Sequence, residues 1–152
     1  MNLSLFKSKV HRQCLTVLDE RIDSINQSIH EIQQSAREDS KSSMGDKYET
    51  GRAMAHLEIE KLQSSLSNLV EMHHILTRID PAEINKDIKA GTLLHTNHGW
   101  MYIATGLGKI TIDGIEIMVI STSAPLIDTL KKVVAGSNRE MNGQKVTIQE
   151  MV

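Results

Sequence analysis

Two long segments with the same hydrophobic repeat flank a polar stretch at residues 37–50, and this symmetry limits the possible folds more than any other feature. In both segments the apolar residues step by three and four positions, which is the seam pattern of a coiled coil. The first ladder consists of Leu15, Leu18, Ile22, Ile25, Ile29 and Ile32. The second consists of Ala55, Ile59, Leu62, Leu66, Leu69, His73 and Leu76. The sequence therefore predicts two long helices that each bury one stripe.

The two ladders match one another as an antiparallel pair. In such a pair the numbers of facing residues have a constant sum. When the first ladder is paired in order with the second in reverse, from Leu15 with His73 to Ile32 with Ala55, the sum is 87 or 88 at every step. The chain is therefore expected to reverse near residues 43–45.

The helix bounds follow from the same pattern. We expect the first helix to begin between Ser8 and His11 and to end near Arg37. The second is expected from about Asp46 to Arg78. Residues 1–80 thus form a coiled-coil hairpin with its tip at residues 37–50.

The composition changes after Asp80-Pro81, where proline disfavours further helix. Seven of the nine glycines lie between Gly91 and Gly143. Runs prone to β-structure occupy residues 92–96, 100–105, 115–121 and 145–151, separated by turn signals at residues 97–99, 106–108, 113–114 and 142–143. Ser123 as an N-cap and Pro125 in the first turn predict one helix between the strands. Residues 81–152 therefore read as a small antiparallel sheet domain with one helix, and the chain as α+β.

Composition excludes several classes of protein. The single cysteine, Cys14, cannot form an intramolecular disulfide and fits a reducing compartment. No apolar run is long enough to span a membrane and the first residues lack a signal-peptide pattern, so we expect a cytoplasmic protein. With 17 basic and 19 acidic residues the chain has no cationic surplus, which disfavours stand-alone nucleic-acid binding.

Three stretches resemble the Gre family of bacterial transcript cleavage factors, which are transcription elongation factors. They are residues 99–104, residues 120–126 followed by residues 130–132, which include the Ser-Thr-Ser-Ala-Pro helix start, and Gly45-Asp46-Lys47-Tyr48-Glu49 with Arg52. The resemblance covers nearly the whole chain. It implies an FKBP-like C-terminal domain that docks on core RNA polymerase, while the coiled coil reaches into the secondary channel.

The resemblance also implies a function for the tip. Family members present two acidic side chains that help to hold Mg²⁺ at the polymerase active centre, where backtracked RNA is cleaved. When Tyr48 is matched to the family's tip tyrosine, the positions of those acids hold Lys41 and Met44. Asp46 and Glu49 keep the three-residue spacing and are the candidate catalytic and metal-binding pair, with Glu38 and Asp39 in reserve. The candidate contact residues of the tip are Lys41, Ser42, Ser43, Lys47, Tyr48 and Arg52.

The partner implied by the resemblance is RNA polymerase, with RNA and DNA contacted only indirectly in the elongation complex. The chain would be a monomeric cofactor of the polymerase rather than an enzyme, and it would not bind membranes. The alternatives are a Gre-like inhibitor that blocks the channel without cleavage, a coiled-coil scaffold, and a prolyl isomerase of the FKBP kind. A metal site at His73-His74 and a phosphate loop at Gly106-Leu107-Gly108-Lys109 are weaker readings, because their spacings do not fit.

Overall fold

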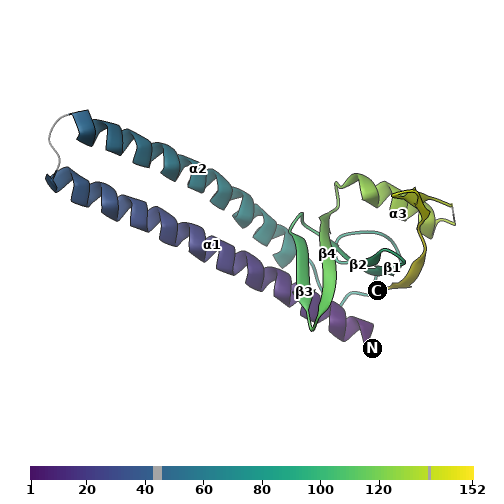
Figure 1. Ribbon diagram of the computed structural model, residues 1–152. Coiled ribbons are helices and arrows are strands. Elements are labelled where there is room, and N and C mark those ends of the chain that lie inside the picture. Colours follow the sequence, from purple (N-terminus) through teal and green to yellow (C-terminus); the bar gives the residue numbers. More distant parts are fainter. Residues whose placement is uncertain (43–45, 137) are drawn as a thin grey trace. The chain divides into compact units, whose positions relative to one another are not determined.

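The computed structural model describes residues 1–42, 46–136 and 138–152, without the side chains of residues 39–48. Two long helices, α1 (Leu3–Ser42) and α2 (Asp46–Thr77), are followed by a sheet and a third helix (Figure 1). The later elements are β1 (Leu93–Thr96), β2 (Gly99–Ala104), β3 (Gly108–Ile112), β4 (Ile115–Ser121), α3 (Pro125–Val134), β5 (Glu140–Met141), β6 (Gln144–Lys145) and β7 (Ile148–Met151). The predicted α+β class is confirmed.

The chain divides into two compact units, and their bounds differ from the predicted domains 1–80 and 81–152. The hairpin unit is Val17–Glu71. The sheet unit combines Met1–Thr16 with Met72–Val152. The predicted boundary at residue 80 marks the region where α2 gives way to irregular chain, whereas the compact sheet unit also includes the first turns of α1 and the last turns of α2.

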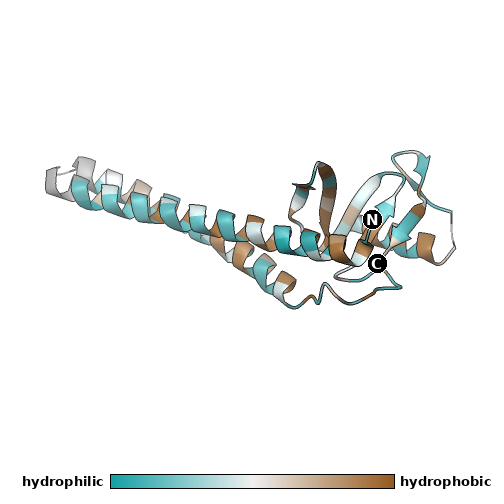
Figure 2. Ribbon diagram, turned by 90° about the horizontal axis from the view of Figure 1, so that it is seen from below, coloured by the Kyte–Doolittle hydropathy of each residue, from teal (hydrophilic) through white to brown (hydrophobic). Residues whose placement is uncertain are grey.

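The hairpin unit confirms the predicted seam. The two helices run side by side in opposite directions (Figure 1), and hydrophobic residues recur at intervals along otherwise hydrophilic ribbons (Figure 2). From Glu49 to Glu71 every residue of α2 is exposed except the five half-buried positions of the predicted ladder, Ala55, Ile59, Leu62, Leu66 and Leu69. In the described part of Val17–Glu71 the two helices pack against each other, and the half-buried positions of α2 follow this stripe.

The start of α1 was predicted too late in the chain. The helix begins at Leu3 rather than between Ser8 and His11, and it continues past Arg37 to Ser42. Its early turns are stabilised by tertiary packing, because Phe6 and Val10 are buried in the sheet unit. The bounds of α2 agree with the prediction, and the expected reversal at residues 43–45 lies outside the residues described.

The sheet is mixed rather than antiparallel, which corrects the prediction. Its strand order is β3-β4-β2-β1-β7. β2 and β4 are parallel, and the other neighbouring pairs are antiparallel. The difference arises because β3 was not predicted. It forms a hairpin with β4 and takes the sheet edge, so β4 lies beside β2 in the same direction. The last predicted strand is also divided, into β6 and β7, and β6 pairs with β5 in a separate two-stranded sheet.

Both faces of the sheet are covered within the sheet unit. One face packs against α3, with a core of Ile88, Leu94, Met101, Ile103, Ile127, Leu130 and Val146. On the other face, Phe6 of α1 contacts Trp100 edge to face, with ring centroids 5.1 Å apart. The N-cap of α3 is Ala124 rather than the predicted Ser123, whose hydroxyl instead hydrogen-bonds that of Ser121 at 2.9 Å. Pro125 is the first residue of α3, a position where its fixed φ suits the helix start.

Candidate functional site

The hairpin tip carries the candidate acidic pair. Since α2 begins at Asp46, its first turn contains both Asp46 and Glu49. A spacing of three residues places side chains on neighbouring positions of one helical face. Acids also favour the first turn because they interact well with the positive end of the helix dipole. Glu49 is exposed, whereas the side chain of Asp46 lies outside the description.

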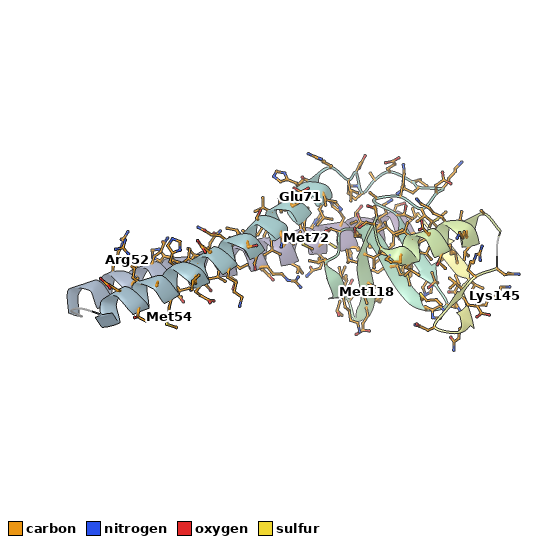
Figure 3. The ribbon with its side chains drawn as sticks, turned by 90° about the horizontal axis from the view of Figure 1, so that it is seen from above. Arg52, Met54, Glu71, Met72, Met118 and Lys145 are labelled. Carbon is orange, nitrogen blue, oxygen red and sulfur yellow. The ribbon has the colours of Figure 1, made fainter. Side chains whose placement is uncertain are left out.

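Only some of the other predicted tip residues have described side chains. Glu38 and Arg52 are exposed, and Glu38 takes part in a polar or electrostatic interaction. Arg52 and Met54 project from opposite sides of α2 (Figure 3). The structure describes the backbone but not the side chains of Asp39, Lys41, Ser42, Lys47 and Tyr48. It does not describe Ser43.

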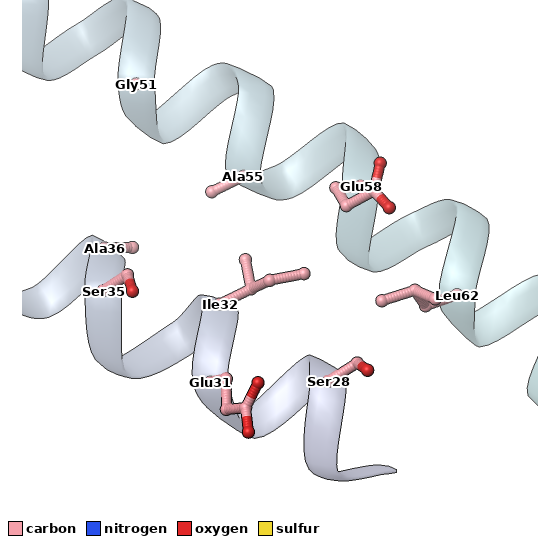
Figure 4. Close-up of a pocket in the computed structure, with 9 residues that line it drawn as sticks. All are labelled: Ser28, Glu31, Ile32, Ser35, Ala36, Gly51, Ala55, Glu58 and Leu62. Carbon is pink, nitrogen blue, oxygen red and sulfur yellow. The ribbon is translucent and has the colours of Figure 1, made fainter. Parts of the chain in front are cut away.

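A groove of about 510 Å³ lies between the two helices close to the tip (Figure 4). Its lining contains small side chains, including Ser35 and Ala36 of α1 and Gly51 of α2. Ile32 and Ala55 point toward each other across it, as the predicted register requires. The groove is therefore a gap left by small residues along the seam, and it presents no cluster of groups suited to catalysis.

A buried polar cluster in the sheet unit was missed by the sequence analysis. His11 Nδ1 lies 2.8 Å from the Tyr102 hydroxyl, and both residues are buried. Lys7 is also fully buried, and its ammonium donates to the backbone carbonyl of Glu83. Burial lowers the pKa of both Lys7 and His11, and it raises the pKa of the nearby Cys14 thiol to about 12. The repeat of Phe6, Val10 and Cys14 at every fourth position was the signal that could have revealed this face.

This cluster has no open path to a substrate. Lys7, Cys14 and Tyr102 have no exposed surface, and the Tyr102 hydroxyl is occupied by His11. Burial also raises the pKa of Tyr102, so the phenol stays protonated. The cluster therefore serves the packing of α1 against the sheet rather than catalysis at a surface.

The two weaker sequence readings receive no structural support. Gly108 begins β3, and Lys109 Nζ forms an ion pair with Glu116 of β4 at 3.0 Å, so this segment is an edge strand rather than a phosphate loop. His73 is half-buried at its predicted seam position, and His74 is exposed. Adjacent helical positions diverge in this way and do not chelate one ion well.

The described part of the chain holds no further candidate site. Among residues whose side chains are described, no three His, Cys, Asp or Glu residues gather as metal ligands. Within the same residues, no helix has the length and apolar character needed to cross a membrane. Comparison of the chain with protein-family models, curated proteins and solved structures finds no match.

Proposed function

We propose that the chain is a Gre-like accessory factor of bacterial RNA polymerase, whose hairpin tip enters the secondary channel. The observation that carries this proposal is the regular antiparallel hairpin whose second helix begins at Asp46, with Glu49 exposed in its first turn. A rigid hairpin suits a protein that must present a few side chains at a distance. The α+β sheet unit, with one helix packed on one sheet face, supports the comparison with the family's C-terminal domain.

In this proposal Asp46 and Glu49 supply oxygen ligands to the polymerase active centre. Carboxylate oxygens are ligands that Mg²⁺ prefers. A second magnesium ion held there would supply Lewis-acid chemistry for cleavage of backtracked RNA. The chain would bring and orient the carboxylates, and the polymerase would catalyse hydrolysis. It would act in the cytoplasm as a monomer and would meet RNA and DNA only within the elongation complex.

A channel-blocking inhibitor is the second candidate. It is favoured by Lys41 and Met44, which occupy the places of the family's acids when the tip is matched through Tyr48. A tip without metal-binding acids would fill the channel without stimulating cleavage. The two candidates share a partner and differ in the sign of their effect on transcription.

The test combines binding with cleavage. The full chain should be retained by immobilised core RNA polymerase and should stimulate RNA cleavage in backtracked complexes. The double variant Asp46→Ala, Glu49→Ala should bind but lose the stimulation. The control, Glu20→Ala with Asp23→Ala, removes two exposed acids of the same spacing from α1 and should behave as the unaltered chain. Binding without cleavage by the unaltered chain would support the inhibitor, and absence of binding would refute both candidates.

The remaining alternatives have less support. A prolyl isomerase needs an apolar pocket lined by aromatic side chains, and Tyr102 is fully buried with its hydroxyl bonded to His11. Catalysed cis–trans isomerisation of a proline peptide by the chain would support the prolyl isomerase alternative. A scaffold that associates through its hairpin would form a stable dimer in light scattering and would not bind the polymerase.

A further inference from the structure

The contact between the first turns of α1 and the sheet includes a histidine, the residue type whose ordinary pKa lies closest to neutral pH. His11 is 7% exposed, and its Nδ1 is 2.8 Å from the hydroxyl of Tyr102 on β2. The two rings meet edge to face, with centroids 6.1 Å apart. A neutral imidazole has one donor and one acceptor nitrogen, so it can satisfy the hydroxyl without carrying charge. A protonated ring has two donors and brings a charge into the interior.

Burial opposes such a charge more strongly than the charged groups around His11 favour it. On α1, Lys7 lies one turn before His11 and Cys14 lies almost one turn after it, and both are fully buried. From β2 the ring meets a neutral phenol. From the segment after α2, Asp80 attracts a proton to the ring, and the Lys7 ammonium repels it. Loss of hydration is the largest influence, and it lowers the pKa of His11.

We propose that the contact between residues 3–16 and the sheet is an acid-sensitive latch, closed while His11 is neutral and weakened when His11 takes up a proton. The rest of the contact includes apolar groups such as Phe6 and Val10, which hold the segment by burial. The proton therefore shifts the balance between closed and open segments rather than creating the contact.

The direction of the effect follows from proton linkage. The closed segment binds the His11 proton more weakly than the open one, in which the ring has its ordinary pKa of about 6.5. The stabilisation by neutral His11 is complete above that value and is lost as the pH falls toward the lowered pKa of the closed state. Within that interval the equilibrium constant for opening rises by up to about tenfold for each pH unit.

Hydrogen exchange of the full chain tests the latch. After correction for the intrinsic pH dependence of exchange, protection of residues 3–16 should fall between pH 7.5 and pH 5.5, while that of β2 and β4 should persist. His11→Gln keeps a polar side chain that can bond Tyr102 but cannot titrate, so its protection should not change with pH. His95→Gln is the control, because it removes a different histidine, whose ring is stacked on that of Trp100 with centroids 4.3 Å apart. This variant should lose protection of residues 3–16 with falling pH as the unaltered chain does.

Two outcomes of the exchange experiment would overturn the proposal. One is an equal loss of protection in His11→Gln and the unaltered chain. The other is a simultaneous loss in β2 and β4, which would indicate global unfolding instead of local opening. A nuclear magnetic resonance titration of the His11 ring in the unaltered chain provides a measurement that needs no variant. It should give a pKa below the ordinary histidine value, and an ordinary or higher value would also refute the latch.

Discussion

Ile32 of α1 and Ala55 of α2 point toward each other across the hairpin seam (Figure 4). This is the pairing that two heptad ladders require when their facing residue numbers add to 87 or 88. The groove beside this pair exists because its neighbours, Ser35, Ala36 and Gly51, are small. The small residues thus leave a groove in the part of the seam that lies toward the start of α2.

Gly51→Ala should stabilise the hairpin. Gly51 lies inside α2, and a β-carbon added there would meet nothing within 4 Å. Alanine should raise the free energy of unfolding by about 0.5–1 kcal/mol, because it restricts the unfolded chain and favours helix. Chemical denaturation followed by circular dichroism measures the change. The reverse substitution at an exposed position of the same helix, Ala53→Gly, should cost a similar amount. A loss of stability in Gly51→Ala would show that the absence of a side chain matters there.

Gly91→Ala should destabilise the sheet unit. Gly91 has a φ of 90°, and an added β-carbon would lie 2.8 Å from Cγ2 of Ile79. The unfavourable backbone conformation and the close contact should together cost about 1–3 kcal/mol. Gly106→Ala is the matched control, because a β-carbon at Gly106 meets nothing within 4 Å. Thermal unfolding should separate the two variants, and equal midpoints would contradict the steric explanation.

The sequence predicted the hairpin well because a long repeat averages over many positions. The seam follows from this ladder, and the reversal that the ladder predicts near residues 43–45 lies outside the described residues. Short strands give no such averaging, and β3 was hidden because Gly108 resembles part of a turn. Without β3 the parallel pairing of β2 with β4 could not be foreseen.

The buried polar face of α1 escaped prediction for a different reason. Lys7 and His11 are polar residue types that are seldom fully buried, so their positions do not extend an apolar stripe in the sequence. Their burial is compensated by hydrogen bonds to tertiary partners, the Glu83 carbonyl for Lys7 and the Tyr102 hydroxyl for His11. Such partners are distant in the sequence and cannot be read from local periodicity.

Cys14 should be unreactive in the folded protein. The residue has no exposed surface, and burial raises the pKa of its thiol to about 12. Since the thiolate is the reactive form, a disulfide reagent at pH 8 should modify Cys14 slowly in buffer and rapidly in denaturant. Reaction at the same rate in both conditions would show that the segment around Cys14 is open in solution.

Leu130→Ala should be the most damaging of these substitutions. Leu130 of α3 is 0% exposed and belongs to the core between the helix and the sheet. Removing its side chain leaves a cavity and should cost about 2–5 kcal/mol. Leu57→Ala provides the control, since Leu57 of α2 is 65% exposed and should change stability by less than about 0.5 kcal/mol. Trp100, the only tryptophan, lies on β2 of the sheet unit, so its fluorescence follows the unfolding of the part that Leu130 stabilises. Similar denaturation midpoints in the two variants would mean that α3 contributes little to the core.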